Sequence, residues 1–215
     1  MSEAREIDTM RRRVLGRLAS AVAVGVGGWS IRAGAQSLPN NRTASWPGPL
    51  KGTYHQVFDG VESRTGKVLA YAANFLADDP EATSAAVVIV RDTAVVIALG
   101  NEIWAKYKIG ETLHFIDPET GAAAVKNPFL HPKPGVLGND DWALDRLLEK
   151  GAVVGACTVA LTGVSHALAH NAGVSPEEAT REWRANVVPG VTLLPSGVWG
   201  VNRAQRTGCS YCFGT

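Results

Sequence analysis

Short apolar runs alternate with longer segments of helical period along most of the chain. Strands are predicted at residues 53–59, 84–90, 152–158, 191–195 and 209–213, of which 84–90 and 152–158 are apolar at nearly every position. The segments whose apolar residues recur at helical spacing predict helices at 62–78, 101–108, 140–151, 159–173, 175–183 and 196–208. The run 93–99 fits a strand or a short helix equally well. Strands that alternate with helices predict a single α/β domain with a mostly parallel sheet flanked by helices.

One long segment, residues 109–139, breaks this alternation. It belongs to a stretch with four prolines and shows little periodicity apart from the strand-like "TLHFID" at 112–117. Loops of this length are usually functional covers or insertions. We therefore expect 109–139 either to cover a pocket at the sheet edge or to be an insertion in the domain.

The first 35 residues have the organisation of a bacterial signal peptide. Arg11–Arg13 precede a weakly hydrophobic run over 18–31, and Ala33 and Ala35 form the small-residue pattern that signal peptidase reads. Consecutive arginines ahead of such a run are typical of the twin-arginine pathway. The run is shorter than the ~20 apolar residues that a membrane-spanning helix needs. These features predict cleavage near Ala35, a periplasmic location and no membrane attachment afterwards.

The predicted organisation is a signal peptide at 1–35, an irregular lead-in with three prolines at 36–52, and a folded domain at 53–215. Removal of residues 1–35 changes the balance from 21 basic and 20 acidic residues to 15 and 17. A slightly acidic chain without a basic patch argues against nucleic acid as a partner. The chain also lacks a G-x-S-x-G elbow, a glycine-rich phosphate loop and an H-E-x-x-H motif, which argues against hydrolysis and nucleotide binding.

Cys157 is the first candidate for chemistry. It stands where the apolar strand 152–158 gives way to the helix 159–173. In open α/β sheets this carboxyl end of a strand is where ligands bind. The N–H groups at the start of the helix also favour a thiolate, the nucleophilic form of cysteine. The alternative is an inert, buried thiol, because free cysteine is among the most buried residue types.

Cys209 and Cys212 form a C-x-x-C near the end of the chain. A redox dithiol of this spacing usually begins a helix, whereas the aromatic residues around this pair predict a strand. Along a strand, positions three apart point to opposite faces, so the two thiols could not bridge each other without a local turn. In an oxidising compartment three cysteines allow one bridge. The pairs 209–212, 157–209 and 157–212 remain open.

His166 and His170 are four residues apart on one face of the predicted helix, a spacing that can hold a metal ion. His166 follows Cys157 by nine residues. That corresponds to roughly 13 Å along a helix, so the histidines would not share an ion with Cys157. We interpret them as ordinary surface residues, keep a metal at His166 and His170 as the weaker alternative, and predict no cofactor.

The order of these pieces resembles the DsrE/DsrF-like sulfur-relay family, in particular its exported twin-arginine branch. The resemblance covers Thr53 to Thr215. It rests on "YHQVFDG", on "GACTVAL" around Cys157 and on the closing run "VVPGVTLLPSGVWGVNRAQRTGCSYCF". The stretch "WAKYKIGETLHFIDPETGAAAVKNPF" is similar to the insertion of the exported branch. The resemblance implies a three-layer, flavodoxin-like or Rossmann-like fold, a homo-oligomer, and a strand-end cysteine that carries sulfane sulfur as a persulfide. Cys157 occupies the matching position.

The resulting hypothesis is a periplasmic sulfur carrier or sulfurtransferase in which Cys157 is the nucleophile. Cys209 or Cys212 would be a resolving or structural thiol, and the partner would be a sulfur donor or acceptor protein or a small sulfur compound. One alternative is a non-enzymatic binding module with a pocket under 109–139 and a structural disulfide. The other is a carrier of a metal or redox cofactor, which export in the folded state would suit.

Overall fold

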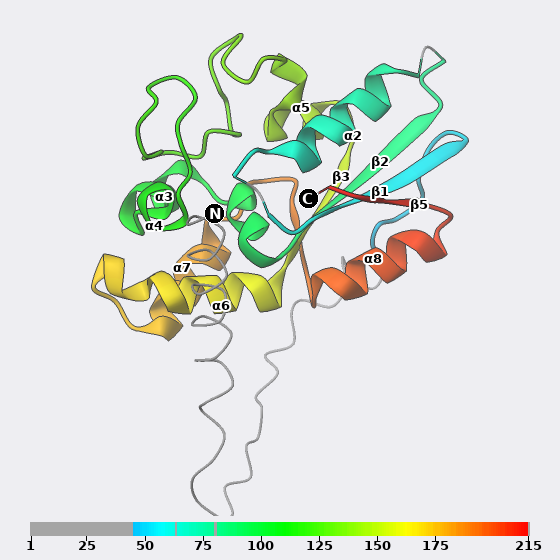
Figure 1. The fold of residues 1–215 in the computed structure, drawn as a ribbon. Coiled ribbons are helices and arrows are strands. Elements are labelled where there is room, and N and C mark those ends of the chain that lie inside the picture. Colours follow the sequence, from blue (N-terminus) through cyan, green and yellow to red (C-terminus); the bar gives the residue numbers. More distant parts are fainter. Residues whose placement is uncertain (1–44, 63, 80, 215) are drawn as a thin grey trace, which may run out of the picture. The chain divides into compact units, whose positions relative to one another are not determined.

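One sheet of five parallel strands organises the part of the chain that the structure, a computed structural model, describes: residues 45–62, 64–79 and 81–214. The strand order is β4-β3-β2-β1-β5, and helices flank the sheet (Figure 1). The predicted single-domain, three-layer α/β fold is confirmed. The strands are β1 (Tyr54–Gly60), β2 (Ser84–Val90), β3 (Val153–Cys157), β4 (Thr192–Leu194) and β5 (Ser210–Phe213).

The strand order also decides which helix covers which face. The first four strands are added in one direction, whereas β5 returns to the free side of β1. Because crossovers between parallel strands are right-handed, reversing the direction puts the last connecting helix on the opposite face from the first. Helix α8 (Gly197–Arg206) therefore lies across the sheet from α2 (Lys67–Ala77), as Figure 1 shows. The other helices are α3 (Asn101–Lys106), α4 (Ile109–Leu113), α5 (Leu144–Glu149), α6 (Thr158–Leu168) and α7 (Pro176–Ala185), with 3-10 turns η1 (Asp92–Ala98), η2 (Asp140–Trp142) and η3 (Ala169–Ala172).

Two hydrophobic cores lie on the two faces because successive strand side chains alternate. Phe58 and Val88 belong to the larger core, which also contains buried residues of α2, α5, α6 and α7. Val57 and Ile89, one position along, belong to a smaller core under α8. The unbroken apolar runs of the central strands therefore reflect burial on both sides.

The lead-in contributes to the smaller core, which corrects the predicted start of the domain at 53. The side chain of Trp46 is 4% exposed and packs beside Leu194 and Ala204. Its ring fits here because Gly155 has no side chain: a Cβ on Gly155 would lie 2.9 Å from the Trp46 ring. The ordered fold therefore includes residues ahead of β1. The predicted signal peptide, 1–35, lies outside the described residues.

Three local predictions need adjustment. The ambiguous run 93–99 is the 3-10 turn η1, whose residues Ala94–Ala98 are all buried. The predicted helix 159–173 is α6 followed by η3, and it ends at Gly173 in a left-handed conformation. The strand-like "TLHFID" is wrong as a strand: α4 ends within it, His114 is left-handed, and Ile116 makes one isolated bridge to Ala123.

The remainder of the long loop is anchored rather than free. Asn127 is 1% exposed, and its Nδ2 donates to the carbonyls of Ile97 and Leu99, both at 2.8 Å. The rings of Phe115 and Phe129 pack edge to face, with centroids 6.3 Å apart, inside the larger core. Because its polar and aromatic side chains fill the domain interior, this segment is part of the fold.

Candidate functional site at the carboxyl edge of the sheet

The carboxyl ends of three neighbouring strands bring together side chains that can react or bind a ligand. Asp59 lies near the end of β1, Arg91 directly follows β2, and Cys157 ends β3. The register pairs Val90 with Ala156, so Arg91 and Cys157 stand at the next matched position. Neighbouring strands are about 4.8 Å apart. This edge is where open parallel sheets bind ligands.

Cys157 is both the last residue of β3 and the N-cap of α6. Its Sγ accepts a hydrogen bond from the backbone N–H of Ala160, 3.3 Å away. This N–H and the positive end of the 11-residue helix stabilise negative charge on the sulfur. The side chain is a free thiol, and the residue is 5% exposed. The predicted position of Cys157 at a strand–helix junction is therefore what the structure shows.

Arg91 and Asp59 form a side-on ion pair at this edge. Arg91 Nε donates to Asp59 Oδ1 at 2.7 Å, and Nη2 donates to Oδ2 at 2.9 Å. The hydroxyl of Tyr211, from β5, also donates to Oδ2 at 2.9 Å. The Asp59 side chain is 3% exposed and that of Arg91 is 28% exposed. The hydrogen bonds to Asp59 raise the pKa of the Arg91 guanidinium, so this cation is held rigidly at the surface end of a buried pair.

The start of α8 closes over Arg91. Gly197, the first residue of α8, lies so close that an added Cβ would be 2.7 Å from Arg91 Cβ and Cδ. The preceding Ser196 caps the helix, because its Oγ accepts a hydrogen bond from the Trp199 N–H at 3.2 Å. The helix N-termini that follow β3 and β4 thus both stand at the edge that carries Arg91 and Cys157.

The terminal cysteines lie away from this edge. Cys212 pairs with Phe58, which is level with Val88 and Val154, so it stands three residues before the level of Cys157 and three strands away. Three strand spacings are about 14 Å, far beyond the ~7 Å between Cα atoms that a disulfide tolerates. Cys209 lies at the opposite, amino end of β5. A bridge from Cys157 to either thiol within one chain is therefore excluded in this arrangement, and the resolving role loses its geometric support.

Cys209 and Cys212 also face opposite sides of the sheet, as their spacing predicts. Cys209 belongs to the smaller core and Cys212 packs against the larger one. Both are free thiols. Burial raises the pKa of the Cys209 thiol, so its environment favours the protonated, unreactive form.

The histidines do not form part of a metal site in the described residues. His166, on α6, and His170, in η3, are both exposed, and His170 Nδ1 contacts the Ala167 carbonyl at 2.9 Å. Across residues 45–62, 64–79 and 81–214, no group of three or more His, Cys, Asp or Glu side chains is placed to hold a metal ion. Two exposed imidazoles would need further ligands to hold an ion tightly.

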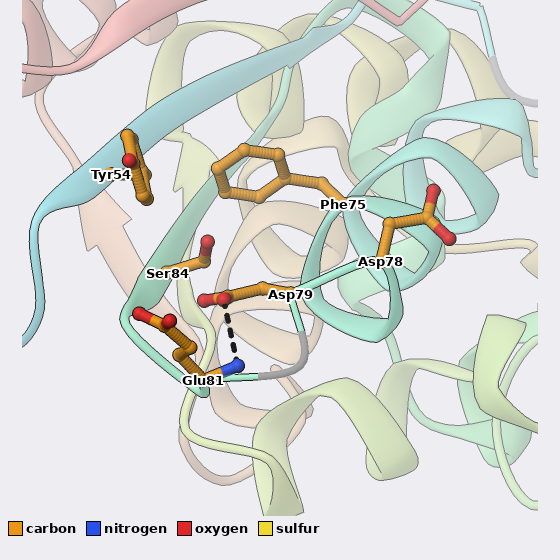
Figure 2. Close-up of a pocket in the computed structure, with 6 residues that line it drawn as sticks. All are labelled: Tyr54, Phe75, Asp78, Asp79, Glu81 and Ser84. Carbon is orange, nitrogen blue, oxygen red and sulfur yellow. Dashed lines mark hydrogen bonds between the residues drawn. The ribbon is translucent and has the colours of Figure 1, made fainter.

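A separate hollow of about 480 Å³ lies at the amino end of β1 and β2. Figure 2 shows Tyr54 and Phe75 on opposite sides of it, while the carboxylate of Asp78 points away. Asp79, on its floor, accepts hydrogen bonds from the Glu81 N–H at 3.2 Å and the Thr83 hydroxyl at 3.3 Å. This carboxylate therefore shapes the turn into β2. The residues that line this hollow include no cysteine and none of 109–139.

Sequence reasoning missed Asp59, Arg91 and Tyr211. The signal for two of them was present: Asp59 interrupts the end of an apolar strand in "VFDG", and Arg91 is the first polar residue after "VVIV". Polar residues at the carboxyl ends of parallel strands converge at one edge. Tyr211 could not be assigned in this way, because its contact with Asp59 depends on the pairing of β5 with β1, which the sequence does not give.

Comparison with protein-family models finds no match for this chain, and comparison with curated proteins finds none either. Within the described residues, no helix combines the length and apolar character needed to cross a bilayer.

Proposed function

We propose that this protein carries sulfane sulfur as a persulfide on Cys157, as a sulfur carrier or sulfurtransferase. The observation that carries the proposal is the backbone N–H of Ala160, which donates to Cys157 Sγ at the start of α6. An N–H donor and a helix N-terminus are the surroundings in which a sulfur atom can carry negative charge during a reaction. The same N–H and helix end would stabilise the negative charge of a persulfide. The predicted signal peptide at 1–35 makes the periplasm the proposed place of action.

The reaction needs one nucleophile and a donor with a transferable sulfur. The Cys157 thiolate attacks the outer sulfur of the donor, the donor's S–S bond breaks, and its inner sulfur leaves as a thiolate with the electron pair. Transfer to an acceptor thiolate repeats this exchange in the opposite direction. Neither half requires Cys209 or Cys212, in keeping with their distance from Cys157.

The test is the intact mass of the purified protein before and after incubation with inorganic polysulfide. We expect a gain of ~32 Da that reductant removes, the signature of a persulfide on one cysteine. Cys157→Ser should abolish this gain, whereas Cys212→Ser, which removes the more exposed free thiol Cys212, should retain it. A gain that survives in Cys157→Ser and disappears in Cys212→Ser would refute the proposal. The absence of any gain in the unmodified chain would refute it as well.

A further inference from the structure

The guanidinium of Arg91 binds Asp59 through one edge and has a second edge that can bind a ligand. Its side-on pair with Asp59 uses Nε and one proton of Nη2. A guanidinium carries five N–H donors. The end-on edge, formed by Nη1 and the other Nη2 proton, has no hydrogen-bond partner among the described residues. The Arg91 side chain is 28% exposed, whereas the Asp59 carboxylate that holds its other edge is 3% exposed, so the guanidinium is within reach of a ligand from solvent.

The surroundings hold that edge in place. Asp59 fixes the guanidinium through two hydrogen bonds, and Tyr211 in turn bonds to Asp59. Gly197 packs against the aliphatic part of the Arg91 side chain. A guanidinium whose rotamer is already fixed loses little conformational entropy when it binds a carboxylate through two parallel hydrogen bonds.

The distance from Arg91 to Cys157 restricts the size of a shared ligand. Because the guanidinium pairs with Asp59 on β1, it lies about two strand spacings, roughly 10 Å, from the β3 position of Cys157. Consider a donor persulfide formed by a cysteine-type thiol, with its outer sulfur in contact with the Cys157 thiolate. The carboxylate of this donor then lies roughly 8 Å from the thiolate sulfur, as summed from standard bond lengths. With a hydrogen bond of about 3 Å added, this length matches the gap. An inorganic sulfur chain lacks a carboxylate at that position.

We propose that Arg91 binds the carboxylate of a small-molecule persulfide, of the kind formed by cysteine or a cysteine-containing peptide, while Cys157 accepts its outer sulfur. This inference rests on the proposed function and names the class of its donor. The Cys157 thiolate and R–S–SH give Cys157–S–SH and R–S⁻: one S–S bond forms, one breaks, the proton stays on the transferred sulfur, and the thiolate leaves with the electron pair. Arg91 acts as a binding residue that orients the donor along the sheet edge.

The test compares two donors that differ in one carboxylate: the persulfides of N-acetylcysteine and N-acetylcysteamine, with inorganic polysulfide as the reference. The readout is the second-order rate of the ~32 Da gain on Cys157. Loss of a bidentate, charge-assisted interaction corresponds to about a tenfold loss of rate or more. We therefore expect the unmodified protein to react about ten times faster with the carboxylate-bearing donor.

Arg91→Lys should remove this preference, because lysine keeps the charge and loses the planar pair of donors. Arg146→Lys, in the exposed pair with Glu149, is the matched control and should leave both rates unchanged. Equal rates with the two donors in the unmodified protein would overturn the inference whether or not Arg91→Lys folds. If polysulfide still loads Cys157 in that case, the proposed function stands and the role of Arg91 alone fails. If polysulfide does not load Cys157, both fail.

Discussion

Neutralising Asp59 should destabilise the fold measurably, because this carboxylate is the centre of the carboxyl edge. It accepts hydrogen bonds from Arg91 at 2.7 and 2.9 Å and from Tyr211 at 2.9 Å, and its side chain is 3% exposed. Asp59→Asn keeps the volume but turns an amide donor toward groups that themselves donate. Removing one partner of a fully buried pair costs about 3–5 kcal/mol.

The expected magnitude for Asp59→Asn is lower than that range. The Arg91 side chain is 28% exposed, so water recovers part of its solvation when the carboxylate is lost. We expect the free energy of unfolding to fall by about 2–3 kcal/mol. Tyr211→Phe removes one of the three hydrogen bonds and should cost about 1 kcal/mol. In the double variant the two losses should not add, because they act on one network.

Urea unfolding measures these changes, provided that the slope with denaturant is unchanged between variants. The control is Glu62→Gln, which neutralises one partner of the exposed pair with Arg64, where the side chains are 48% and 52% exposed. This control should lie within about 0.5 kcal/mol of the unmodified protein. If Asp59→Asn were as stable as Glu62→Gln, or if its effect added fully to that of Tyr211→Phe, the buried network would not exist as described.

Three other predictions test the fold and the remaining thiols. Trp46→Ala should lower the free energy of unfolding by about 3–5 kcal/mol, because it leaves a cavity in the smaller core. Urea unfolding measures this change, and a loss below about 1 kcal/mol would contradict the place of Trp46 in the fold. Hydrogen bonds from Lys106 and Tyr107 lower the pKa of Glu182, so its stabilising contribution is present above the unfolded pKa and is lost as pH falls through the lower folded value. Glu182→Gln should therefore flatten the loss of stability that occurs as pH falls below 4.5, the ordinary pKa of a glutamate, and an unchanged profile would contradict this. Cys209 should be alkylated more slowly than Cys212 at about pH 8, because burial raises the pKa of the Cys209 thiol. Mass analysis of the peptides would measure the two rates, and equal rates would contradict the burial of Cys209.

The helices and strands could be predicted from the local sequence pattern where an element is buried in the same way along its whole length. The run "SAAVVIV" is a strand over the predicted residues, because a central strand is covered on both faces and therefore apolar throughout. The predicted helix 175–183 is α7, which begins after Ser175, whose Oγ accepts a hydrogen bond from the Glu178 N–H at 3.1 Å. Cys157 could likewise be placed at a strand–helix junction, because both the strand and the helix are continuous in the sequence.

Strand order and long-range contact were decided by the tertiary structure. Nothing in the local sequence pattern states that β5 pairs with β1, which separates Cys212 from Cys157 and brings Tyr211 to Asp59. Trp46 looked like part of an irregular lead-in, because Gly155, which makes room for its ring, lies more than a hundred residues away along the chain. Arg91 became a candidate ligand-binding residue once its partner on β1 was known. The sequence by itself determined most of the elements and the place of Cys157 at a strand–helix junction, since both depend on neighbouring residues, whereas the surroundings of that thiol depend on which strands pair.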